Sequence, residues 1–243
     1  MRLKSVIEST LRGFPPLYRL GSRMYHKMNP EFRTLSPGAP GAIRDAFELV
    51  RKEQGSAAKV GDYYEFGLFR GGTFLATSQI LDEMGLDVVH MYGFDSFEGL
   101  PEATGIDAGD TRFFEGQFAC SREEVESNLL KNGMKLNRAT LIEGYYEDSL
   151  TEELHGQHPF RPAAVVLLDC DYYSSTVVAM DWLNRYVGVG TVLLFDDWFS
   201  YGDDGSLGQQ KALAEWLDKH QQYRVEQLED FQSNGRGFIL RAA

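Results

Sequence analysis

Residues 163–198 read AAVVLLDCDYYSSTVVAMDWLNRYVGVGTVLLFDDW, with two short apolar runs separated by a segment of helical length. This pattern is typical of two neighbouring parallel strands that are buried on both faces. Asp169 and Asp171 follow the first run, and Asp196 and Asp197 follow the second. Open α/β sheets bind ligands at the carboxyl ends of their strands, so we expect these carboxylates to meet there. Carboxylates at close range need a cation or bound protons, which predicts a binding site.

The rest of the chain repeats the order of strand followed by helix. Apolar periodicity and turn residues predict strands at 61–69, 87–94, 139–143, 163–168 and 191–195. Helices are expected at 42–54, 74–83, 121–133, 175–187 and 207–220, with a further helix beginning at 151–154. Residues 223–228 and 237–241 flank Ser233-Asn234-Gly235 and predict a closing hairpin. Together these elements predict a Rossmann-like α/β fold, whose seven-stranded, mostly parallel sheet has its last strand antiparallel and helices on both faces.

Length and composition fit one large domain at 42–243 behind a helical arm or lid at 1–41. The chain has 243 residues, of which 43% are hydrophobic. A net charge of −12 argues against a nucleic-acid partner, because phosphate binding needs clustered Lys and Arg. Cys120 and Cys170 show no metal-binding spacing and indicate reduced thiols in a cytoplasmic protein.

The first forty residues alternate helical pieces with glycine and proline. They contain neither a secretory signal nor an apolar run long enough to span a membrane. An amphipathic helix is expected at 6–11, and residues 17–28 mix aromatic with basic side chains. We favour a packing arm for this segment, with a substrate-facing lid or an arm that joins a homo-oligomer as the functional alternatives.

EFGLFRGGT at residues 65–73 predicts a tight turn between a strand and a helix. Its glycines let backbone N–H groups approach a ligand, although the spacing is neither the dinucleotide fingerprint nor a phosphate-binding Walker loop. Glu65 favours a cationic or amine-bearing ligand over a pyrophosphate, whose charge it would repel. The alternative is a purely structural turn.

Two further loops carry candidate ligand contacts. Asp95 ends the second predicted strand, where an acidic residue binds ribose hydroxyls in nucleotide-binding folds, unless it serves only the turn. Ser96 could bond the same ring, and Phe97 could offer an apolar face to an adenine. Residues 143–148 follow the third strand, and an acidic or tyrosine side chain there could bind a base, although solvated loop charges are the common case.

Asp169, Asp196 and Asp197 lie one strand–helix–strand unit apart, so neighbouring strand ends could bring their carboxylates to one ion. An all-oxygen set suits Mg²⁺ or Ca²⁺ rather than Zn²⁺. The alternative is that one aspartate caps the next helix and the others are solvated.

These motifs resemble the TylF/macrocin-type O-methyltransferases, a family of class I S-adenosylmethionine-dependent enzymes. The resemblance rests on EFGLFRGGT, DSFEGLP (95–101), LLDCDYYSST (167–176) and FDDW (195–198), and covers about residues 60–240. The chain departs from the family where Cys170 replaces a glycine and where Trp198 replaces a tyrosine. The resemblance implies a class I methyltransferase fold with Asp169, Asp196 and Asp197 on Mg²⁺, and catalytic roles for Asp169 and Asp197. The cofactor site would comprise Glu65, Gly67, Arg70, Gly71, Gly72, Thr73, Asp95, Ser96, Phe97, Gly144 and Asp148.

The implied reaction is Mg²⁺-assisted methyl transfer from S-adenosylmethionine to a small-molecule hydroxyl, on a sugar of a glycosylated natural product or on a vicinal diol. His90, His155 and His158 are candidate general bases by residue type only. Two alternatives stay open: a metal-dependent glycosyltransferase that uses Asp169-Cys170-Asp171, and a non-catalytic nucleotide-binding protein on the same fold.

Overall fold

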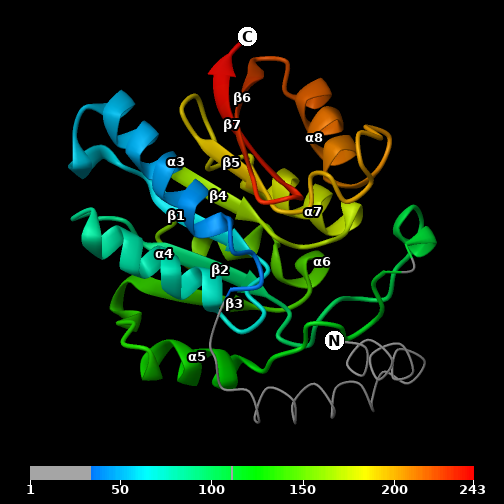
Figure 1. Ribbon diagram of the computed structural model, residues 1–243, viewed down its shortest axis with the longest axis horizontal. Coiled ribbons are helices and arrows are strands. Elements are labelled where there is room, and N and C mark those ends of the chain that lie inside the picture. Colours follow the sequence, from blue (N-terminus) through cyan, green and yellow to red (C-terminus); the bar gives the residue numbers. More distant parts are fainter. Residues whose placement is uncertain (1–33, 111) are drawn as a thin grey trace.

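A seven-stranded sheet runs through the centre of the structure (Figure 1), a computed structural model that describes residues 34–110 and 112–243. The strand order is β3-β2-β1-β4-β5-β7-β6. Only the pairings of β7 with β5 and with β6 are antiparallel, which confirms the predicted sheet. The strands are β1 (Asp62–Phe66), β2 (Met91–Asp95), β3 (Ala139–Glu143), β4 (Ala163–Leu168), β5 (Val192–Phe195), β6 (Tyr223–Phe231) and β7 (Gly235–Ala242).

Helices cover both faces of the sheet. One apolar core lies beneath α3 (Ala39–Gln54), α4 (Gly72–Glu83) and α5 (Arg122–Lys131). The other lies beneath α6 (Tyr146–Ser149), α7 (Tyr173–Leu183) and α8 (Gly208–Lys219). The six residues of β4 are all buried, and three of them pack into each core. Burial on both faces explains why this strand reads as a continuous apolar run.

Local signals set several element ends as expected. The Ser121 side chain accepts the Glu124 N–H at 3.3 Å and caps α5. Gly55, in the left-handed conformation, ends α3 after Gln54. Helix α3 begins three residues earlier than expected because Pro40 suits its first turn.

Other expected boundaries were wrong. The loop expected at 144–150 contains α6, and the helix expected from residue 151 is only a 3-10 turn at Glu153–Gly156. Helix α7 ends at Leu183 rather than 187, since the turn that follows presents the Tyr186 carbonyl to the N–H of Ala163 at the start of β4. Strand β1 ends at Phe66 because Gly67, with φ of +94°, turns the chain away.

The segments expected at 6–11 and 17–28 lie outside the described residues, so the arm and a homo-oligomer formed through it stay predictions. The cytoplasmic location stays a prediction as well. Within the described residues, no helix combines the length and apolar character needed to cross a membrane.

Candidate functional site

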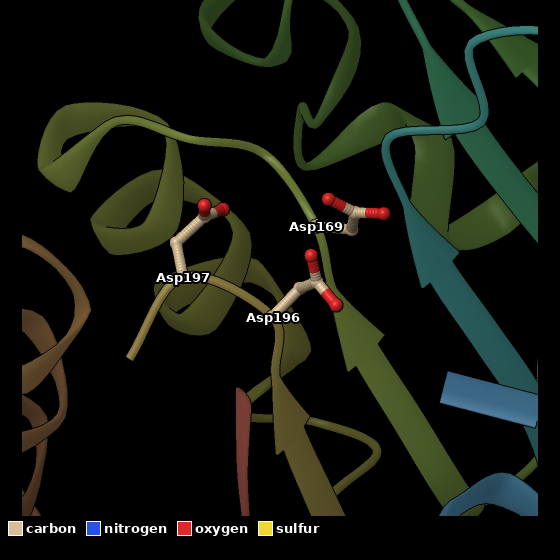
Figure 2. A group of neighbouring side chains, drawn as sticks. All are labelled: Asp169, Asp196 and Asp197. Atoms are coloured by element: carbon tan, nitrogen blue, oxygen red, sulfur yellow. The ribbon is translucent and has the colours of Figure 1, made fainter. Parts of the chain in front are cut away.

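The carboxylates of Asp169, Asp196 and Asp197 gather at the adjoining ends of β4 and β5. Leu168 pairs with Phe195, so the residue that follows each strand reaches the same edge of the sheet. One oxygen from each of the three carboxylates lies within 4.8 Å of the others. Figure 2 shows Asp169 beyond the end of β4, with Asp196 and Asp197 in succession beyond β5. The expected cluster is therefore present, and we call these three residues the acid cluster.

Burial and mutual repulsion act on this acid cluster. They raise the pKa of Asp196 to about 7, with burial as the larger cause and Asp197 next. The pKa of Asp169 is raised well above its ordinary value by burial and then by Asp196. Burial also raises the pKa of Asp197, although the Asp171 N–H and Ser200 hydroxyl oppose the rise. These carboxyls must bind protons or share a cation. An all-oxygen donor set of this span fits Mg²⁺ or another hard divalent cation.

The cation-free protein is expected to lose stability as pH rises from about 4 to about 7. A carboxyl whose pKa is raised by folding binds its proton more tightly in the folded state, so its favourable contribution disappears as pH passes through the folded pKa. For Asp196 this window runs from 3.8 to about 7. With chelator present, Asp196→Asn should melt above the wild type by about 4 °C at about pH 8, with little gain at about pH 4. A difference in melting temperature that stays constant across this range would contradict the expectation.

Gln209 fixes the distance between the two strand ends that carry the acid cluster. Its Oε1 accepts the Asp197 N–H at 2.9 Å, and its Nε2 donates to the Leu168 carbonyl at 3.0 Å. Gln209 is 1% exposed, and its role was not predicted from the sequence. A usable signal was present, because Gln209 precedes Ala212 and Leu213 by three and four positions on the buried face of α8.

The glycine turn after β1 brings the chain against the end of β4. A Cβ on Gly67 would lie 1.8 Å from the Asp169 carbonyl oxygen, so only glycine fits there. Gly71 is the N-cap residue of α4, with φ of +83°. Glu65 lies behind the turn, 1% exposed, and accepts the Tyr63 hydroxyl at 2.6 Å. Burial raises the pKa of Glu65 to about 8 despite that bond.

Asp95 holds this turn through its carboxylate. One oxygen accepts the N–H groups of Leu68 at 2.7 Å and Phe69 at 3.0 Å, and the other accepts that of Phe97 at 2.7 Å. These three bonds oppose the rise in the pKa of Asp95 that burial causes. Asp95 lines the cavity, and the three bonds of its carboxylate also hold the turn in place. The sequence offered a turn role for Asp95 only as the alternative, because the N–H groups of Leu68 and Phe69 come from a turn 27 and 26 positions away.

A cavity beside the acid cluster collects most of the candidate cofactor residues. Its lining includes the predicted residues Gly67, Arg70, Gly72, Thr73, Asp95, Ser96, Gly144, Asp169, Asp196 and Asp197. Glu65 and Gly71 are not part of the lining and lie behind it. Phe97 is 5% exposed and packs into the core under α3, α4 and α5, so its ring offers no face to the cavity. Asp148 faces a separate hollow beside β3.

Phe118, from the loop over the sheet edge, completes the cavity and was not predicted from the sequence. Phe118 lines it together with Phe69, and their rings meet edge to face at 5.7 Å between centroids. Both have left-handed backbones, with φ of +62° and +49°. Such strain in bulky residues is a feature of functional sites. The loop is held down by Asp107, which accepts the N–H groups of Tyr173 at 2.9 Å and Ser174 at 3.0 Å at the start of α7.

The three candidate histidine bases lie elsewhere, and that prediction was wrong. None of them lines the cavity. His90 directly precedes β2, and its ring bonds to the Thr140 hydroxyl at 2.8 Å. His155 bonds to the Tyr186 hydroxyl at 2.6 Å, and His158 packs on Phe160. Each precedes a parallel strand, which places it at the amino end of the sheet, opposite the acid cluster.

Known proteins resemble this chain over much of its length. The family model for macrocin O-methyltransferase (TylF) matches residues 42–218. The 8-demethyl-8-(2,3-dimethoxy-alpha-L-rhamnosyl)-tetracenomycin-C 4'-O-methyltransferase of Streptomyces olivaceus is 30% identical over 144 residues, which is 57% of this chain and 53% of that protein. The demethyldecarbamoylnovobiocin O-methyltransferase of Streptomyces niveus is 29% identical over the same shares. The chain thus spans about half the length of the curated relatives it matches.

The solved structure of the O-methyltransferase NovP supports the fold. It superposes with a TM-score of 0.69 at 24% sequence identity, and the match covers 85% of this chain and 81% of that chain.

Proposed function

Because this chain belongs to the TylF macrocin O-methyltransferase family, we propose that it transfers the methyl group of S-adenosylmethionine to a hydroxyl of a small molecule. The observation that carries the proposal is the position of the acid cluster on the same cavity as the glycine turn. One half of that cavity suits an adenosyl cofactor, and the other suits a hydroxyl beside a cation.

The cofactor would lie across the carboxyl ends of β1, β2 and β3. Gly67, Gly72 and Thr73 line the cavity where backbone can approach the amino acid part of the cofactor closely. Arg70 would stand beside them, while Glu65 and Gly71 would shape the turn from behind. Asp95 and Ser96 lie where ribose hydroxyls would bind, and Gly144 lies at the end of β3, near the base.

The acid cluster would hold Mg²⁺ through Asp169, Asp196 and Asp197, with Asp169 and Asp197 as the catalytic pair. The ion would supply Lewis acidity that lowers the pKa of an acceptor hydroxyl. The acceptor oxygen would attack the methyl carbon in line with the breaking bond to sulfur, and its proton would pass to a nearby carboxylate.

A sugar hydroxyl of a glycosylated natural product, or one of a vicinal pair, is the acceptor we propose. The relatives named above support this class, since one carries a rhamnosyl tetracenomycin in its name and the other demethyldecarbamoylnovobiocin. The acid cluster and Asp171 also line the cavity, which favours a neutral or cationic acceptor over a phosphorylated one.

A screen of glycosylated and catecholic acceptors with S-adenosylmethionine tests the proposal. We expect S-adenosylhomocysteine to form together with a methylated acceptor, more rapidly with Mg²⁺ than with chelator. Calorimetry should show that S-adenosylhomocysteine binds without metal. Metal-dependent binding of UDP in its place would instead favour the glycosyltransferase. Cofactor binding with no methylated product from any acceptor would favour the non-catalytic binding protein.

A further inference from the structure

Two side chains from outside the strand–helix–strand unit hold the Asp196 carboxylate. The Ser36 hydroxyl lies 2.9 Å from Oδ2 of Asp196 and 3.3 Å from Oδ2 of Asp169. The Gln232 Nε2 donates to Oδ1 of Asp196 at 2.7 Å. Both oxygens of Asp196 are therefore engaged by hydrogen-bond donors of the protein. Ser36 is 4% exposed, so its hydroxyl is largely removed from competing water.

These donors come from segments that are far apart in sequence and packed together in space. Ser36 precedes α3, whereas Gln232 lies in the turn between β6 and β7. The Gln232 Oε1 accepts the Gly38 N–H at 3.2 Å, so one amide bridges this segment to the acid cluster. A Cβ on Gly38 would lie 2.9 Å from the backbone nitrogen of Gln232, which shows how closely the two backbones approach.

Residues 34–38 also reach the cofactor half of the cavity. The Thr34 hydroxyl bonds to that of Thr73 in the first turn of α4, and Thr34 and Ser36 both line the cavity. The segment thus connects the acid cluster to the start of α4. Gln232 has a left-handed backbone, with φ of +51°. Strain of this kind in a residue whose side chain ends at the site points to a role beyond packing.

We propose that Ser36 and Gln232 are positioning residues that orient the Asp196 carboxylate for a divalent cation, and that they link residues 34–38 to occupancy of the acid cluster. The proposal rests on the cation site proposed above. A ligating carboxylate that is already hydrogen-bonded loses less rotational freedom when the ion binds. Such outer donors commonly alter metal affinity by about 10- to 100-fold.

Calorimetric titration of Mn²⁺ or Mg²⁺ into the full chain tests the positioning role. Ser36→Ala and Gln232→Leu should each weaken cation binding by about 10-fold, with affinity for S-adenosylhomocysteine unchanged when no cation is present. Ser36→Thr keeps the hydroxyl and should restore most of the affinity. Melting temperatures would show that each variant is folded.

Two matched control variants remove an amide and a hydroxyl at exposed positions outside the acid cluster. Gln227→Leu alters an exposed glutamine of β6. Ser206→Ala breaks an exposed serine–carboxylate bond, 2.6 Å long, to Asp204. Both should bind the cation as the wild type does.

Hydrogen exchange gives a readout that does not depend on activity. Coupling between two sites is reciprocal, so the cation should slow amide exchange in residues 34–38 of the wild type. The same addition should have little effect on these amides in Gln232→Leu. Wild-type cation affinity in both variants would overturn the positioning role alone. A wild type that binds no divalent cation would overturn the cation site as well, and S-adenosylhomocysteine binding would then report separately on the methyltransferase assignment.

Discussion

Methyl transfer by an Asp169→Asn variant is expected to fall by about 10³-fold, because the change removes one charge from the acid cluster where the acceptor hydroxyl is activated. Asp169 takes part in both the predicted cation site and the predicted catalytic pair. Its carboxylate lies within 4.8 Å of those of Asp196 and Asp197, so the remaining pair would bind a divalent cation more weakly. Initial rates at saturating S-adenosylmethionine, measured across a Mg²⁺ series, would show both effects.

The same variant should bind S-adenosylhomocysteine normally, because Asp169 lies beside the turn rather than within it. Asp218→Asn is the matched control, since it removes an identical charge from an exposed position on α8. It should keep the wild-type rate. A fall of less than about tenfold in Asp169→Asn would contradict a central role for this carboxylate.

Gly67→Ala is expected to destabilise the fold by about 4 kcal/mol or more, which is a large part of the stability of an ordinary domain. Its Cβ would lie 1.8 Å from the Asp169 carbonyl oxygen, and neither backbone can move without breaking the ladder between β1 and β4. The φ of +94° adds a conformational cost. Chemical denaturation, or loss of soluble protein if the fold fails, would measure the effect.

Gly55→Ala separates these two causes. Gly55 also has a positive φ, of +69°, but a Cβ there meets nothing within 4 Å. The control should lose only about 1 kcal/mol, from the left-handed backbone alone. Equal losses in the two variants would show that the contact with Asp169 has little effect.

Patterns within single segments predicted the sheet and the acid cluster well. The two apolar runs could be placed side by side because parallel strands of a βαβ unit have few alternatives. The residues that follow them, Asp169 and Asp196, then had to share one edge. The glycine turn was placed by the same reasoning, since it directly follows a buried strand.

Contacts between segments without a shared period could not be predicted. Ser36 and Gln232 reach Asp196 from opposite ends of the chain, and no periodicity relates them. Asp95 was expected to bind a ligand, with a turn role as the alternative, and its bonds to the distant N–H groups of Leu68 and Phe69 could not be predicted. The histidines were chosen by residue type alone, although their places before strands already implied the opposite edge of the sheet.

Residues with a left-handed backbone limit how the thermal stability of this protein can be raised. Five non-glycine residues have positive φ, namely Phe69, Phe97, Phe118, Asp171 and Gln232, among the residues that the structure describes. All except Phe97 line the cavity or bond to the acid cluster. Glycine at position 232 would relieve about 1 kcal/mol of strain and would also delete the amide that holds Asp196. Selection for thermostability alone would therefore favour replacing these residues and would remove their contacts at the site. Directed evolution for thermostability should be paired with a screen for turnover.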